Sequence, residues 1–269
     1  MLGAIAGDVI GSVYERNKAW QQVRSPAFEP LFARRAHFTD DTVLTAAVAD
    51  CILRAADLTD VLKEYAGMYP GAGYGGTFAK WAVSDDREPY GSWGNGSAMR
   101  VSPVGFAYDS LEEVLVRARW SAEVTHNHPD GIAGAQATAA AVFLARTGSS
   151  KDEIREYVER KFGYDLGVPL DELRPGFRFD VSCPGTVPPA LRAFLEATDY
   201  ESAVRLAVSL GGDADTLACI AGAVAGAFYG VPADIRRQAL ERLDDHLRGV
   251  VEGFERRFPA AARVGEPPA

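Results

Sequence analysis

The sequence predicts an all-α fold. Apolar residues recur at helical spacing along most of the 269 residues, and the alternation typical of strands is nearly absent. Residues that favour helix starts, such as Asp57, Ser110 and Pro232, precede several of the apolar stretches. The clearest predicted helices span roughly residues 41–56, 58–68, 74–83, 97–107, 110–123, 129–147, 151–162, 187–197, 199–210, 214–229 and 233–252.

Two of these helices, at 129–147 and 214–229, are rich in alanine and glycine. Small side chains let neighbouring helices approach closely from several sides, so we expect both near the centre of the protein. No Ser/Gly linker, run of like charges or repeat divides the chain. We therefore expect residues 1–269 to form a single domain, a compact orthogonal helical bundle.

Two stretches have weak periodicity. Residues 16–37 mix charged, aromatic and proline residues, and residues 164–186 are rich in proline and glycine. Long irregular segments in a compact domain are often lids or binding loops. A plain surface excursion is an equally good interpretation of either stretch.

Composition narrows the class of protein. Hydrophobic residues make up 47% of the chain and charged residues 24%, as in ordinary globular proteins. The net charge of −9 argues against stable nucleic-acid binding and against anionic membranes, because both favour basic surfaces. A phosphate-bearing ligand stays compatible with this charge if metal ions supply positive charge locally.

The cysteines and the N-terminal stretch indicate the cellular location of the protein. Cys51, Cys183 and Cys219 are odd in number and far apart, so we expect buried, reduced thiols in a cytoplasmic protein. Residues 1–15 contain no basic residue, and Asp8 interrupts their apolar run, so we expect no signal peptide. No apolar run reaches the roughly 18 residues of a membrane span. We expect a monomer.

Two acidic clusters each come directly before a predicted central or apolar helix. "TDD" stands at 39–41 and "GGDADT" at 211–216. Helix capping explains each cluster alone, because Thr and Asp side chains accept hydrogen bonds from free backbone N–H groups and suit the helix dipole. Asp213 would be the second cap, after glycines that permit the turn.

The two clusters together suggest a metal site. All their donors are hard oxygens, which favour Mg²⁺ or Mn²⁺ over zinc. Four carboxylates gathered without a metal would repel one another and raise their pKa values, whereas two divalent cations would balance their charge. These four carboxylates are Asp40, Asp41, Asp213 and Asp215. We therefore expect a two-metal site that can polarise a phosphate or ribose oxygen or activate a water.

The stretch "GAIAGDVIGSVYE" at 3–15 adds two carboxylates. A buried Asp8 needs a partner, either a backbone group or a metal ligand that it orients. Glu15 follows two turns later on about the same helical face. The alternative interpretation of Glu15 is a solvated side chain at the end of a helix.

Six motifs occur in one order along nearly the whole chain: "GAIAGDVIGSVYE" (3–15), "FTDDT" (38–42), "YGGTFAKW" (74–81), "GNGSAMRVSPVG" (94–105), "THNHPDGIAGAQATA" (125–139) and "SLGGDADTLACIAGAVAGAFYG" (209–230). In this combination the chain resembles the ADP-ribosylglycohydrolases, which include the hydrolase that reactivates ADP-ribosylated dinitrogen reductase. The resemblance implies an all-α fold around a central binuclear magnesium site. Its implied metal ligands are Thr39, Asp40, Asp41, Asp213, Asp215 and Thr216.

The resemblance also implies a reaction. The family cleaves the glycosidic bond between C1″ of ADP-ribose and an acceptor, which is usually arginine in bacterial members and serine in some others. We therefore expect a Mg²⁺-dependent hydrolase that releases ADP-ribose, with protein arginine as the leading acceptor. The sequence does not decide between this acceptor and serine, a nucleobase, or a small-molecule substrate such as O-acetyl-ADP-ribose.

The glycine-rich motifs then acquire roles as ADP-ribose contacts, although ordinary helix-connecting turns would explain them without the resemblance. The expected substrate-binding residues are Gly75, Gly76, Trp93, Gly94, Asn95, Gly96, Ser97 and His126. The glycines would expose backbone N–H groups to a diphosphate, and Ser97 lies at a helix start that suits phosphate. Asn95 would donate to phosphate or ribose oxygens, and Trp93 would form a wall.

The expected mechanism follows from the oxocarbenium-like transition state of glycoside hydrolysis. Metals would position the ribose hydroxyls, and Asp40, Asp213 or Asp215 would deprotonate the attacking water. Glu15 would bond a ribose hydroxyl or gate access. A non-catalytic ADP-ribose binder of the same fold is the main alternative, since the family includes lens crystallins. A two-metal hydrolase acting on nucleotide phosphates is a third.

Overall fold

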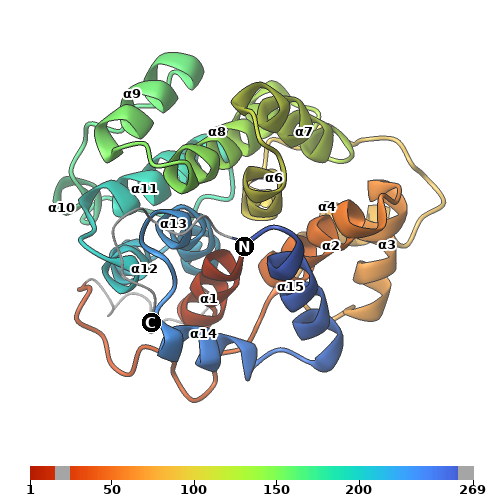
Figure 1. The fold of residues 1–269 in the computed structure, drawn as a ribbon, viewed down its shortest axis with the longest axis horizontal. Helices are drawn as coiled ribbons and strands as arrows, with labels where there is room; N and C mark the ends of the chain where they lie inside the picture. Colours follow the sequence, from red (N-terminus) through yellow and green to blue (C-terminus); the bar gives the residue numbers. More distant parts are fainter. Residues whose placement is uncertain (16–24, 260–269) are drawn as a thin grey trace.

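The computed structural model describes residues 1–15 and 25–259, and it confirms the all-α fold (Figure 1). In these ranges the backbone forms no strand, only an isolated bridge between Gly94 and Ser182. The helices are α1 (Leu2–Gly11), α2 (Asp40–Arg54), α3 (Leu58–Met68), α4 (Gly76–Ala82), α5 (Gly96–Met99), α6 (Ser102–Ala107), α7 (Leu111–Glu123), α8 (Pro129–Arg146), α9 (Lys151–Phe162), α10 (Leu170–Leu173), α11 (Cys183–Glu196), α12 (Tyr200–Ser209), α13 (Ala214–Tyr229), α14 (Ala233–Leu240) and α15 (Asp245–Arg257).

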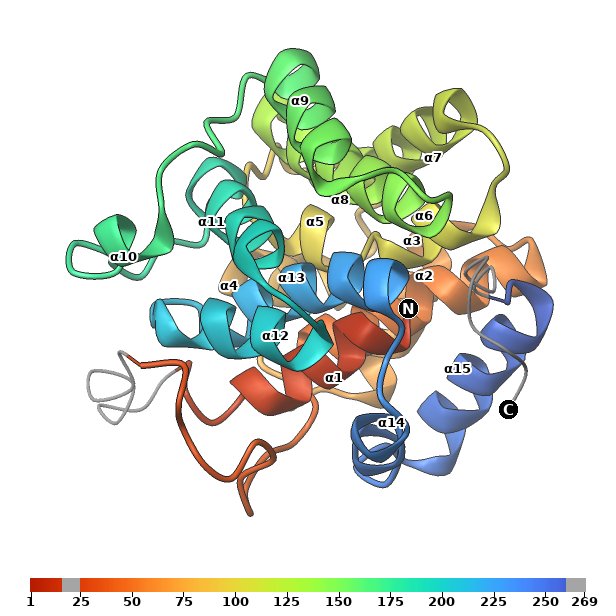
Figure 2. The same ribbon diagram turned by 60° about the vertical axis from the view of Figure 1, so that its left-hand side comes forward.

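Helices α1 and α13, from opposite ends of the chain, run against each other at the centre (Figures 1 and 2). A Cβ atom at Gly7 would lie 2.0 Å from the carbonyl oxygen of Ala218, and one at Gly3 would lie 2.3 Å from that of Gly222. Only glycine allows this approach. The predicted central position of 214–229 is confirmed, since α13 also packs against α8, α11 and α12.

Several predicted helices differ in their bounds. The expected helix at 97–107 is split into α5 and α6, because Pro103 lacks the N–H that a continuous helix needs there. The expected helix at 233–252 is split into α14 and α15, because Asp244 caps a new helix by accepting a hydrogen bond from the Leu247 backbone N–H at 2.9 Å.

Helix α11 begins at Cys183 rather than at 187, because Ser182 caps it and Pro184 is tolerated in the first turn. The irregular stretch 164–186 therefore contains α10 and the start of α11. Part of the other stretch, residues 16–24, lies outside the described residues, and 25–37 form neither helix nor strand.

The three cysteines are free and buried, as predicted. In the described part of the chain, no helix is long and apolar enough to cross a membrane.

Candidate active site

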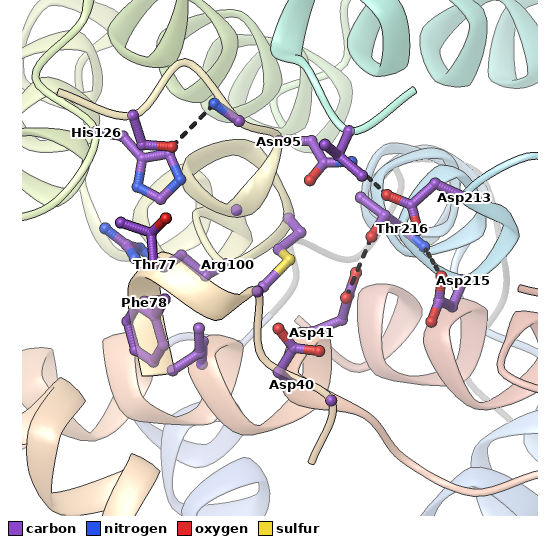
Figure 3. A pocket seen from close by; sticks show the side chains of 18 of the residues that line it. Asp40, Asp41, Thr77, Phe78, Asn95, Arg100, His126, Asp213, Asp215 and Thr216 are labelled. Atoms are coloured by element: carbon purple, nitrogen blue, oxygen red, sulfur yellow. Dashed lines mark hydrogen bonds between the residues drawn. The ribbon is translucent and has the colours of Figure 1, made fainter. Parts of the chain in front are cut away.

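A cavity of about 370 Å³ opens where α2, α4, α5 and α13 begin. Its lining residues are Glu15, Asp40, Asp41, Leu44, Gly73, Gly75, Gly76, Thr77, Phe78, Tyr90, Ser92, Gly94, Asn95, Gly96, Met99, Arg100, His126, Phe179, Val181, Asp213, Asp215 and Thr216. Figure 3 shows the labelled carboxylates at one end of this cavity and His126, Thr77 and Phe78 at the other.

Asp8 fixes the start of α2. Its buried carboxylate accepts hydrogen bonds from the Thr39 backbone N–H at 3.0 Å and the Thr39 hydroxyl at 2.7 Å. It also accepts from the backbone N–H and the hydroxyl of Thr42. Thr39 in turn caps α2 by accepting from the Asp41 N–H at 3.3 Å. The expectation that Asp8 bonds backbone groups is confirmed, and this network directs Asp40 and Asp41 into the cavity.

A glycine turn places Asp213 at the start of α13. Gly211 and Gly212 have φ angles of 74° and 68°, in the left-handed region that favours glycine. Asp213 occupies the N-cap position but makes no capping bond with its side chain. Its carboxylate instead accepts a hydrogen bond from the Asn95 side-chain amide at 2.6 Å. Capping therefore explains Thr39 but not Asp213.

The two acidic clusters meet. The Thr216 hydroxyl donates to Asp41 Oδ2 at 3.2 Å. Carboxylate oxygens of Asp8, Asp41 and Asp215 lie within 4.8 Å of one another, and so do those of Glu15, Asp213 and Asp215. Asp41 Oδ1 is buried and has no hydrogen-bond partner among the described residues.

This crowding changes the acidity of the carboxyl groups. Burial, and next the charge of Asp8, raises the pKa of Asp40 to about 7. Burial first and neighbouring carboxylates second raise the pKa values of Asp41 and Asp215 well above their usual range. Buried carboxylates with an unsatisfied oxygen suit a hard divalent cation, so the residues present fit Mg²⁺ or Mn²⁺.

Five of the six predicted metal ligands line the cavity; the sixth, Thr39, is buried beside it with its hydroxyl bonded to Asp8. The predicted Glu15 also lines the cavity and is half-buried. Their role as ligands or catalytic groups stays a prediction.

The predicted substrate contacts are divided. Six of them line the cavity: Gly75, Gly76, Gly94, Asn95, Gly96 and His126. Ser97 is fully buried and donates to the Gly131 carbonyl at 2.7 Å, outside the lining. Trp93 is 57% exposed, and its ring lies against His128 rather than in the cavity wall.

Sequence reasoning missed much of the wall. Thr77 and Phe78 lie within the motif at 74–81, which pointed only to its two glycines, and Tyr90 lies between two motifs without a signal of its own. Phe179 and Val181 come from the irregular stretch 164–186, where proline and glycine content pointed to a loop but not to particular side chains. That loop reaches the site because the Val181 carbonyl accepts from the Asn95 backbone N–H at 2.7 Å.

The fold and the site define an all-helical protein with a ligand cavity that ends in a cluster of buried carboxylates. The sequence profile of the ADP-ribosylglycohydrolase family matches residues 1–267. The chain therefore belongs to the ADP-ribosylglycohydrolase family, and it is an enzyme of the ADP-ribosyl hydrolase class.

Individual relatives agree with this placement. The chain is 29% identical to ADP-ribosylhydrolase ARH3 of Mus musculus, over 95% of this chain and 87% of the mouse protein. It is 32% identical to ADP-ribosylarginine hydrolase Tri1 of Pseudomonas putida, over 51% of this chain and 39% of that protein. A solved structure described as an ADP-ribosylglycohydrolase-related protein complex superposes with a TM-score of 0.71 at 28% identity, covering 95% of both chains.

Proposed function

We propose that this enzyme hydrolyses the glycosidic bond between ADP-ribose and protein arginine in a reaction that depends on two Mg²⁺ ions, with Mn²⁺ as a possible replacement. The observation that carries the proposal is the junction of Asp41 and Thr216 beside a cavity long enough to extend to His126. This contact places a cluster of hard-oxygen donors at one end of a cavity whose polar and aromatic lining residues suit a nucleotide.

The ions would be held by Asp40, Asp41, Asp213, Asp215 and Thr216, with Thr39 at the edge of this set. When bound, divalent cations supply positive charge that offsets the carboxylates and polarises ribose oxygens. Asn95 fixes the orientation of Asp213 through its 2.6 Å hydrogen bond, so this carboxylate needs no rearrangement when the substrate binds.

The protein's own groups supply the proton transfer and the water exclusion. We propose that Asp40, Asp213 or Asp215 takes the proton of the attacking water and that Glu15 bonds a ribose hydroxyl at the rim. A carboxylate face beside C1″ also stabilises the positive charge of an oxocarbenium-like transition state. The apolar and aromatic lining residues, among them Phe78, Tyr90 and Phe179, limit the contact of the bound substrate with bulk solvent.

Leaving-group chemistry supports arginine as the acceptor. Guanidine is a better leaving group than an alkoxide, so little acid assistance is needed. The Pseudomonas putida relative is named as a hydrolase of ADP-ribosylarginine.

The test is a panel of ADP-ribosyl-arginine, ADP-ribosyl-serine and O-acetyl-ADP-ribose, each assayed with Mg²⁺ and with EDTA. We expect free ADP-ribose, fastest from the arginine substrate and only with metal. Release of AMP or phosphate would identify a phosphate-directed hydrolase instead. Tight ADP-ribose binding without turnover of any substrate would identify a non-catalytic binder.

A further inference from the structure

A series of hydrogen bonds connects the loop at 179–181 to a carboxylate of the site. The Asn95 amide nitrogen donates to Asp213 Oδ2 at 2.6 Å (Figure 3) and to the Thr186 hydroxyl at 3.1 Å. The Thr186 hydroxyl in turn donates to the Asp180 carbonyl at 3.2 Å. Thr186 is fully buried and Asn95 is 7% exposed, so these bonds lie where the effective dielectric is lower than in water.

The donors and acceptors in this series fix the orientation of the Asn95 amide. A threonine hydroxyl has one hydrogen, and a backbone carbonyl only accepts, so the hydrogen of Thr186 is directed to Asp180. Thr186 must therefore accept from Asn95, and only the NH₂ end of an amide can donate. This requirement does not depend on Asp213. The amide keeps its NH₂ end toward the carboxylate whatever that carboxylate binds.

The acceptor at Asp180 is itself held in place. The Asp180 carboxylate accepts from the Ser182 backbone N–H at 2.8 Å. A Cβ atom at Gly185 would lie 2.1 Å from Asp180 Oδ2, so the first turn of α11 admits this carboxylate only because glycine stands there. The Val181 carbonyl also accepts from the Asn95 backbone N–H at 2.7 Å. Asn95 is therefore attached to this segment through both its backbone and its side chain.

We propose that Thr186 is a positioning residue that holds the Asn95 amide against Asp213, so that this carboxylate is oriented before a divalent cation binds. The cation rests on the proposed function; the orientation of the amide does not. Without the Thr186 hydroxyl, the amide would lose one of its two fixed contacts and would be free to turn when a cation draws on Asp213. A carboxylate oriented in advance loses less conformational freedom on binding. Thr186 thus raises the affinity for the cation without contacting it.

The first test uses the metal-free protein. In the ¹H–¹⁵N NMR spectrum, the Asn95 side-chain amide should give two hydrogen resonances that exchange slowly with solvent and are absent in Asn95→Ala. Thr186→Val keeps the shape of the side chain and removes the hydroxyl. We expect it to speed this exchange about fivefold, which corresponds to one hydrogen bond to a neutral partner. Rapid exchange in the wild type, or equally slow exchange in the valine variant, contradicts the proposal.

The second test measures Mn²⁺ affinity by titration calorimetry. We expect about fivefold weaker binding by Thr186→Val and wild-type binding by Thr186→Ser, which keeps the hydroxyl. The matched control is Thr138→Val in α8, because Thr138 is equally buried and its hydroxyl has no hydrogen-bond partner among the described residues. This control should bind Mn²⁺ like the wild type. Unchanged affinity in Thr186→Val overturns the proposal.

A double variant separates positioning from a general disturbance of α11. If Thr186 acts through Asn95, Thr186→Val should cause no further loss of Mn²⁺ affinity in an Asn95→Ala background. An equal loss in both backgrounds would show that valine disturbs the site by another route, and the proposal would then be wrong. A wild-type protein with the slowly exchanging amide and no affinity for Mn²⁺ contradicts the proposed function instead.

Discussion

The Thr216 hydroxyl donates a hydrogen bond to Asp41 across 3.2 Å, and the two residues are 175 positions apart in the chain. This contact depends on the close approach of α1 to α13, since Asp8 of α1 fixes the start of α2 while Gly11 packs against the backbone of Asp215. The glycine contacts at the centre of the fold therefore set the distances between carboxylates in the site.

Asp213 is predicted to be needed for catalysis and not for folding. Asp213→Asn keeps the shape and the Asn95 neighbour but loses a negative charge, so we expect at least a 100-fold loss of kcat, about 2.7 kcal/mol in the barrier. The melting temperature without metal should stay equal or rise, because carboxylate repulsion falls. The matched control is Asp245→Asn on the exposed surface of α15, which should change neither. Full turnover by Asp213→Asn would remove this residue from the site.

Metal binding should stabilise the folded enzyme. A Mg²⁺ concentration 100 times the dissociation constant should add about 2.7 kcal/mol per site to the free energy of unfolding, measured by urea denaturation with and without EDTA. Asp41→Asn should abolish most of this gain, because the unsatisfied Asp41 Oδ1 is the buried oxygen best placed for a cation. Equal stabilisation of wild type and variant would place the cation elsewhere.

The metal-free enzyme should lose stability as the pH rises from about 5 to about 7. The Asp40 carboxyl has a pKa of about 7 in the folded chain against 3.8 as its ordinary value, so in this window the folded state binds more protons than the unfolded state. Its stabilising effect is complete below the lower pKa and is lost as the pH passes the higher one. The slope should reach about 1.4 kcal/mol per pH unit for one proton.

Urea denaturation in EDTA at several pH values gives this slope directly. Asp40→Asn should have a shallower profile, and saturating Mg²⁺ should flatten the wild-type profile because the ions favour the ionised carboxylates. A wild-type profile in EDTA that is flat or rises over this window would show that the carboxylates are not crowded as described.

The contact between α1 and α13 should tolerate no added methyl group. Gly7→Ala would place a Cβ 2.0 Å from the Ala218 carbonyl oxygen, so we expect a loss of several kcal/mol in the free energy of unfolding, roughly 3 or more. Gly67→Ala in α3 is the control, since nothing lies within 4 Å of its added Cβ. It should be neutral or stabilising by up to about 1 kcal/mol. A Gly7→Ala protein as stable as this control would disprove the packing argument.

Much of the fold could be predicted because helical periodicity is a local property. The starts of α3 and α8 follow from Asp57, Pro129 and their neighbours. The breaks between α5 and α6 and between α14 and α15 were harder, because the apolar pattern continues across Pro103 and Asp244. There a single missing or diverted backbone hydrogen bond decides the outcome.

The candidate site could also be predicted only in part. Charge arithmetic on Asp40, Asp41, Asp213 and Asp215 predicted that two remote clusters meet, and all four residues line one cavity, where Asp41 and Asp215 lie close together. Ser97 and Trp93 lie outside the cavity wall, because a motif shows which residues are near a site but not which way each side chain points. Phe179 carries no sequence signal, since it reaches the cavity only through the path of an irregular loop.

We propose that carboxylates from two remote segments of the chain hold a pair of hard cations beside the substrate cavity. Anomalous scattering from a crystal soaked in Mn²⁺ would locate such cations directly. We predict two peaks at the carboxylate end of the cavity, in contact with Asp41, Asp213 and Asp215. A well-ordered site without anomalous density, or peaks only at surface carboxylates, would contradict the account.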